Sequence, residues 1–170
     1  ILSSIRTIAA KYRISGVVID YLQILNVNMR GTNKEQQMAD VARRLKNLAK
    51  DLGIWIIALS QLNRDNSNHL PSLNRLRDSG QIAEAADIVL LLYRPEVYGR
   101  SYPEPFKSVP VKGTAMVDIA KGRNIGLRKF IVGFDPATTS FHSMKEAKNA
   151  PPEVATGNDM ENDEDDDTPF

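Results

Sequence analysis

A carboxylate follows directly after a short apolar run near the start of the chain, where Val17, Val18 and Ile19 precede Asp20. The run is rich in β-branched residues, which predicts a buried parallel strand that ends at the acid. An acid at a strand tip can hold a Mg²⁺ ion, directly or through water, beside a bound triphosphate. Taken alone, however, the motif is more typical of an aspartate that caps the following turn.

Two further positions have side chains that suit phosphate chemistry. A second apolar run, IWIIALS, leads into Gln61, whose neutral amide can hydrogen-bond a γ-phosphate and respond to its loss. Lys121 and Arg123 are separated by Gly122, and in an extended chain side chains two residues apart point the same way. Two cations on one side suit a phosphate chain. The alternatives are a polar residue that ends a strand and a solvated basic hairpin.

The elements that must position these residues alternate between helix and strand. The apolar spacing predicts helices near residues 5–9, over 35–52 and after the turn at Ser79-Gly80. Strands are predicted at residues 17–20, 54–60, 87–93, 115–121 and 129–134, the last two as a hairpin, with a short final strand after them. Residues 94–113 contain four prolines and are predicted to form a surface excursion.

This order predicts an α/β fold with a mostly parallel sheet flanked by helices and a late antiparallel hairpin. In such sheets ligands bind at the carboxyl ends of the strands. Asp20, Gln61 and Lys121 all fall at such ends, which is the first functional signal.

Charge and composition narrow the function classes. The chain has no cysteine and two histidines, so a disulfide framework, a cysteine zinc site and a His-rich metal site are excluded. No apolar run is long enough for a bilayer span, and we expect a cytoplasmic protein. All 22 basic residues lie in residues 1–150, whereas eight of the 21 acidic residues lie in 151–170, which leaves the body at +9. A basic body with an acidic tail indicates nucleic acid as a partner, with a merely soluble basic domain as the alternative.

Four segments, in this order and spacing, resemble DnaB-type replicative helicases over about residues 1–142: GVVIDYLQIL, ARRLKNLAKDLGIWIIALSQLNR, LRDSGQIAEAADIVLLLYR and IAKGRNIGLRKFIVGF. The resemblance implies a partial RecA-like P-loop NTPase core over residues 1–144. It also implies Mg²⁺ and ATP as cofactors and a ring-shaped homo-hexamer that moves on single-stranded DNA.

The resemblance assigns a role to each candidate. Asp20 takes the place of the Walker B aspartate on the Mg²⁺ shell, and Gln61 that of the γ-phosphate sensor. Lys121 and Arg123 match the pair that the family donates to the nucleotide of the neighbouring subunit, with Arg123 as the arginine finger. Such a finger is useful where charge spreads over the leaving phosphate.

The resemblance also places DNA contacts on two loops. The first is formed by Arg77, Asp78, Ser79 and Gly80. Gly80 permits close approach of the backbone to a phosphate, and Arg77 adds charge that binds without reading sequence. The family usually has Glu in place of Asp78. Residues 26–34, with Arg30 and Lys34, lie where a second channel loop is expected.

The chain contains no GxxxxGK[ST] sequence. In the family the P-loop and a catalytic glutamate precede the Walker B strand, so we expect these 170 residues alone not to hydrolyse ATP. Two other functions stay open, namely a recombination-type RecA ATPase and a DNA or replisome binding module without ATPase activity.

Residues 145–170 are predicted to be a disordered acidic tail. The ending DDDTPF resembles the acidic tip of bacterial single-stranded-DNA-binding proteins, although Thr168 replaces an apolar residue. The residues concerned are Asp165, Asp166, Asp167, Pro169 and Phe170. Phe170 can fill an apolar pocket on a replisome partner such as primase while the acids steer its approach. The alternatives are a solubilising tail and a tail that occupies the chain's own DNA channel.

Overall fold

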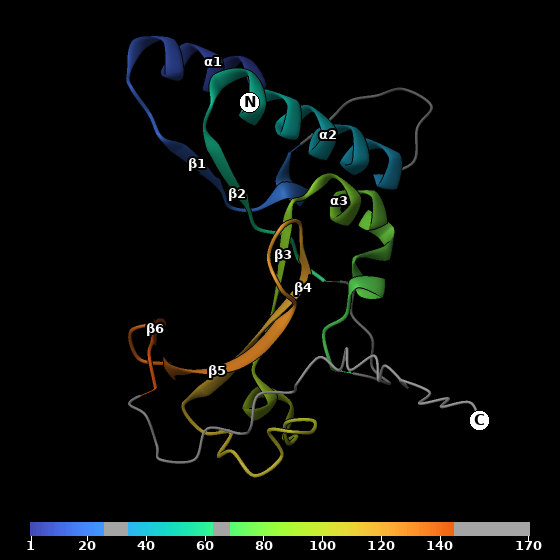
Figure 1. Cartoon of the computed structure of the whole chain (residues 1–170), viewed down its shortest axis with the longest axis vertical. Helices are drawn as coiled ribbons and strands as arrows, with labels where there is room; N and C mark the ends of the chain where they lie inside the picture. The colour runs from blue at the N-terminus through green and yellow to red at the C-terminus, as the bar shows by residue number, and fades with distance from the viewer. Residues whose placement is uncertain (26–33, 63–68, 145–170) are drawn as a thin grey trace, which may run out of the picture.

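The computed structural model describes residues 1–25, 34–62 and 69–144, with residues 34, 35 and 77–81 as backbone only. These residues form a two-stranded parallel sheet and a four-stranded antiparallel sheet (Figure 1). The first part of the chain contains α1 (Leu2–Lys11), β1 (Gly16–Ile19), η1 (Leu22–Ile24), α2 (Lys34–Leu52) and β2 (Trp55–Ala58). The rest contains η2 (Leu73–Ser79), α3 (Gly80–Ala85), β3 (Ile88–Tyr93), η3 (Pro95–Tyr98), β4 (Thr114–Gly122), β5 (Arg128–Asp135) and β6 (Ser140–His142). Among the described helices, none has the length and apolar character to cross a membrane.

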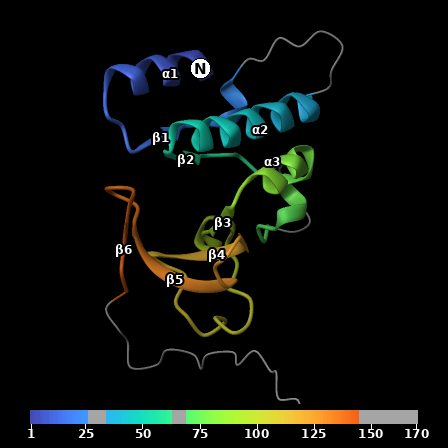
Figure 2. The same ribbon diagram turned by 45° about the horizontal axis from the view of Figure 1, so that its top comes forward.

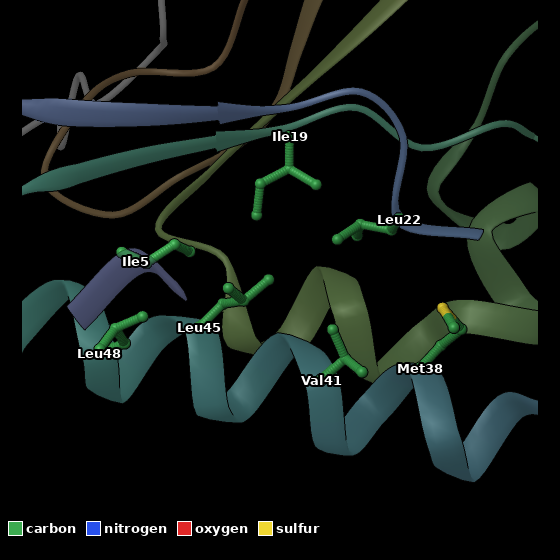
Figure 3. Packing of buried hydrophobic residues seen from close by; sticks show 7 residues of the cluster. All are labelled: Ile5, Ile19, Leu22, Met38, Val41, Leu45 and Leu48. Atoms are coloured by element: carbon green, nitrogen blue, oxygen red, sulfur yellow. The ribbon is translucent and has the colours of Figure 1, made fainter. Parts of the chain in front are cut away.

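Helix α2 supplies most of the core beneath the parallel strands. Its buried residues recur three or four positions apart along one stripe, as the sequence predicts: Met38, Val41, Leu45 and Leu48. This stripe packs against Ile5 of α1, Ile19 of β1 and Leu22 of η1 (Figure 3). The helix ends before Gly53, whose φ of 63° lies in the left-handed region that glycine adopts without strain. The predicted helix over residues 35–52 is therefore confirmed.

Strands β1 and β2 run parallel, with Ile19 beside Ala58. The pairing continues past both strands, because Leu59 N–H donates to the Ile19 carbonyl at 2.9 Å and Leu22 N–H donates to the Leu59 carbonyl at 2.9 Å. The carboxyl ends of the two strands therefore stay together, and the residues that follow them share one edge of the sheet.

The prediction of a mostly parallel sheet is wrong, although the α/β class is confirmed. Strands β3, β4, β5 and β6 pair antiparallel in chain order, and only β1 and β2 are parallel among the described strands. A parallel pairing needs a crossover, usually a helix. After β3 the connections contain only turns and the short η3, so each strand returns beside its predecessor. Figure 2 shows α1 and α2 on one side of the β1–β2 pair and the antiparallel sheet extending away from the other side.

The strands around residues 17–20 and 54–60 were expected to be buried, and this is only half correct. One face of the parallel pair packs on the helices, but Val18 and Ile57 are 58% and 53% exposed. Trp55 and Leu59 are exposed as well. Within the described residues nothing covers this face, although the strands carry apolar side chains on both sides, as strands buried on both faces do.

The excursion over residues 94–113 is more than a surface loop. Tyr102 and Phe106 are buried in it and pack with Tyr93 of β3 and Met116 of β4. The Tyr102 hydroxyl lies 2.9 Å from the Thr114 hydroxyl, so the buried phenol has a partner. Sequence periodicity misses this second core because its aromatic residues are spread over an irregular segment.

The α2 stripe generates a stability prediction. Leu48 is 1% exposed, so Leu48→Ala removes buried methyl groups and leaves a cavity. We expect the free energy of unfolding, measured by urea denaturation, to fall by about 2–5 kcal/mol. Leu92→Ala is the control, since Leu92 is 51% exposed and truncation there should cost well under half as much. Equal losses in the two variants would contradict the assignment of the core.

Candidate functional site

Asp20 lies directly after β1, at the carboxyl edge of the parallel pair, and its side chain is exposed. A single carboxylate at such an edge fits Mg²⁺, which binds through one or two carboxylates and keeps several water and phosphate oxygens. No group of three or more His, Asp or Glu side chains in the described part of the chain could hold a metal alone. Asp20 is therefore a candidate for a single carboxylate ligand of Mg²⁺, and no cluster of metal ligands accompanies it among the described residues.

Gln61 is held at the same edge by a residue that sequence analysis missed. The Gln23 side chain of η1 donates to the Ser60 hydroxyl at 2.9 Å and to the Gln61 carbonyl at 3.2 Å. Gln61 N–H donates back to the Gln23 side-chain oxygen at 3.4 Å. The backbone after β2 is thus attached to the turn that follows Asp20, while the Gln61 side chain remains exposed. The structure brings Asp20 and Gln61 to one edge.

Lys121 lies at the far end of β4 and contacts α3. Its ammonium group donates to the Ala83 carbonyl at 2.6 Å and to the Glu84 carbonyl at 2.9 Å. These carbonyls belong to the last turn of α3, where backbone acceptors lack partners within the helix and attract a cation. A β-bulge precedes the contact, because Val89 pairs with Lys121 whereas Leu90 pairs with Ile119. Such bulges can re-aim side chains, and this one lies directly before Lys121.

Arg123 belongs to a small cluster of charges around Asp87. Arg123 N–H donates to the Asp87 carbonyl at 2.7 Å, and its guanidinium lies 3.5 Å from one Asp87 carboxylate oxygen. The Lys46 ammonium of α2 pairs with the other oxygen. Sequence analysis missed both Asp87 and Lys46, since an acid before a strand and a lysine on a helix are ordinary surface features.

The same cluster changes the acidity of Asp87. The hydrogen bond from Lys46 lowers the pKa of the Asp87 carboxyl, with help from the charges of Lys46 and Arg123, while partial burial opposes the shift. A carboxyl whose pKa is lower in the folded than in the unfolded state stabilises the fold above its unfolded pKa. That contribution is lost as the pH falls through the lowered pKa, so the cluster is intact at neutral pH.

The candidates therefore form two pairs on two different sheets. Asp20 and Gln61 share the edge of the β1–β2 pair, whereas Lys121 lies at the end of β4 and contacts the last turn of α3. Arg123 follows β4 and contacts Asp87, between α3 and β3. Lys121 and Arg123 have separate contacts, with α3 and with Asp87, and Arg123 lies in the turn after β4, so their joint role at a phosphate stays a prediction.

Gly122 lies between the two cations, and it allows the hairpin to fold tightly. A Cβ atom there would lie 2.4 Å from an Ile125 side-chain carbon and 2.9 Å from the Ile125 carbonyl oxygen. Both contacts are closer than real Cβ atoms approach, and one is with the backbone, so a larger residue would displace the hairpin.

The remaining candidates are described in part or not at all. Residues 77–80 form the junction where η2 passes into α3, and only their backbone is described. Their assignment to DNA remains a prediction. Arg30 and the tail residues Asp165, Asp166, Asp167, Pro169 and Phe170 lie outside the described residues. Lys34 opens α2, and its side chain is outside the described set.

Comparison with known proteins matches this geometry to one family. The model of the DnaB-like helicase C-terminal domain matches residues 1–143. A probable plasmid replicative DNA helicase of Chlamydia muridarum is 34% identical over 148 residues, which is 85% of this chain and 30% of that protein. The replicative DNA helicase DnaB of Leifsonia xyli is 37% identical over 131 residues, or 75% of this chain and 27% of that protein.

Solved structures give the same result. A DnaB-like replicative helicase, studied with its interactions with primase, superposes with a TM-score of 0.71 at 30% identity, over 85% of this chain and 35% of that one. A solved ATPase domain superposes with a TM-score of 0.72 at 30% identity, and this chain covers 50% of it. The chain thus spans about 30% of the length of the curated relatives it matches. The expected resemblance is confirmed, and the chain belongs to the DnaB-like helicase C-terminal domain family.

Proposed function

We propose that this chain forms part of a replicative DNA helicase, an ATP hydrolase that moves on single-stranded DNA and parts the duplex at the replication fork. The observation that carries the proposal is the shared edge of β1 and β2, where Asp20 is exposed and Gln61 is attached through Gln23. In this reading Asp20 holds the Mg²⁺ of bound ATP and the Gln61 amide hydrogen-bonds the γ-phosphate.

Lys121 and Arg123 provide the other half of the site, which acts on the nucleotide of a neighbouring subunit. The Arg123 side chain is 61% exposed. Its ion pair is with Asp87, which follows α3, and not with a residue at the β1–β2 edge of its own chain. A cation at the subunit surface is available to a second copy. This arrangement makes hydrolysis depend on the ring interface, and we propose a homo-hexameric ring.

The DNA is held by the loop at residues 77–80, with phosphate contacts that do not depend on sequence. The net charge of residues 1–150 supports binding to phosphates, since they carry nine more basic than acidic side chains. We further propose that the protein acts in the cytoplasm and that its tail contacts primase or another replisome protein. Because the 170 residues contain no GxxxxGK[ST] sequence, we propose that they do not hydrolyse ATP alone.

Removal of the Asp20 charge tests the nucleotide site. In the full-length protein that carries this domain, Asp20→Asn should lower the rate of ATP hydrolysis by about 10–100-fold, because the Mg²⁺ shell loses a ligand or an oriented water. Excess Mg²⁺ should restore part of the loss, as measured by phosphate release. Asp51→Asn is a matched control, because Asp51 is an exposed acid that pairs with Arg6 at 3.0 Å. Unchanged hydrolysis in Asp20→Asn would refute this role.

The DNA loop is tested by Arg77→Ala in the same full-length protein. Affinity for single-stranded DNA should fall for every sequence alike. The slope of log affinity against log salt should become shallower by about 0.7, the value for one lost phosphate contact on a single strand. Fluorescence anisotropy at several salt concentrations gives both quantities. The control is Arg13→Ala, which removes an exposed arginine outside the loop. If the two variants have the same salt slope as the unmodified protein, residues 77–80 do not bind the phosphate backbone.

A further inference from the structure

Asp87 lies between the end of α3 and the start of β3, and its carboxylate is shared by two cations. One oxygen takes the Lys46 ammonium and the other lies 3.5 Å from Arg123 Nη1. Each carboxylate oxygen therefore has one cation beside it. Arg123 lies in the turn directly after β4, Lys46 lies on α2, and both are distant from Asp87 in sequence.

The contact constrains Arg123 in two ways. Its backbone N–H donates to the Asp87 carbonyl at 2.7 Å, which fixes the main chain just beyond Gly122. The side-chain contact then directs one edge of the guanidinium toward Asp87. A guanidinium has five N–H donors in a rigid fork, so engaging Nη1 leaves the others available to phosphate oxygens. The side chain is 61% exposed, and its free donors therefore face solvent or a partner.

Lys46 limits how strongly Asp87 holds the Arg123 guanidinium. An unshared carboxylate could hold the guanidinium through both oxygens in a bidentate pair, which would occupy the donors that a phosphate needs. With Lys46 at one oxygen, Arg123 pairs with the other oxygen alone. Asp87 therefore orients the Arg123 guanidinium and leaves part of its charge and its N–H donors for a phosphate.

We propose that Asp87 is a positioning residue that holds Arg123 in the orientation in which it reaches the nucleotide of the neighbouring subunit. The inference rests on the proposed function, since it assumes that Arg123 acts on that nucleotide. It adds a residue that does not touch the nucleotide and acts only through Arg123.

The test is Asp87→Asn in the full-length protein, which keeps the shape of the side chain and the backbone contact but removes the charge. With saturating single-stranded DNA, kcat for ATP hydrolysis should fall about tenfold, because a misplaced catalytic group loses part of its effect. KM for ATP should stay within about twofold, as for an interaction made only in the transition state. Sedimentation should show the same ring assembly. Asp51→Asn, at a comparably exposed ion pair, should leave kcat unchanged.

A double-mutant cycle separates positioning from general structural damage. If Asp87 acts through Arg123, then Asp87→Asn should have no further effect on the single-turnover rate in an Arg123→Ala background. Asp87→Glu, which keeps the charge, should recover most of the rate. The inference is overturned if Asp87→Asn leaves kcat unchanged, or if it lowers the rate by the same factor with and without Arg123.

Failure of the proposed function has a different signature. In that case the unmodified full-length protein would show no DNA-stimulated ATP hydrolysis, or Arg123→Ala would hydrolyse ATP at the unmodified rate. Either result would overturn the role of Arg123 and the positioning role of Asp87 with it. A normal effect of Arg123→Ala together with no effect of Asp87→Asn would overturn the positioning role alone.

Discussion

The parallel pairing of β1 with β2 is the constraint on which the candidate site depends. Its backbone hydrogen bonds run past the strands through Ile19, Leu59 and Leu22, and the α2 stripe packs beneath them. Because parallel strands end at one edge, Asp20 and Gln61 reach that edge although 40 residues of chain separate them. Gln23 then attaches one turn to the other. Loss of the α2 core would therefore remove the site as well as the stability.

The second constraint is the short stretch from α3 to Asp87. It begins at the loop assigned to DNA, residues 77–80, and its far end contacts both candidate cations. Lys121 binds the last carbonyls of α3, and Arg123 binds Asp87. A bulge in β4 directly precedes Lys121, and at Gly122, between the two cations, Ile125 leaves no room for a Cβ atom. One short segment thus carries the proposed DNA loop at one end and the proposed trans-acting pair at the other.

Local patterns predicted the elements well, and contacts between distant residues were harder to predict. The apolar stripe from Met38 to Leu48 and the stop at Gly53 follow from helix periodicity and backbone preference. Strand direction does not follow from these patterns, because β-branched residues suit parallel and antiparallel strands alike. The hairpin of β4 and β5 was predicted correctly, but the antiparallel pairing of β3 with β4 was not. Gln23 and Asp87 were missed for a related reason. Their partners lie 36 to 41 residues away, and neither side chain stands out by type or spacing.

The central claim is that Asp20 and Arg123 serve the same nucleotide from different subunits. It is tested most directly by mixing two full-length variants, Asp20→Asn and Arg123→Ala, each of which should be nearly inactive alone. In rings formed from an equal mixture, about a quarter of the interfaces combine an intact Asp20 with an intact Arg123, since each interface joins different surfaces of two subunits. We expect ATP hydrolysis to reappear in the mixture. A mixture no more active than the two separate variants, despite demonstrated formation of mixed rings, would contradict it.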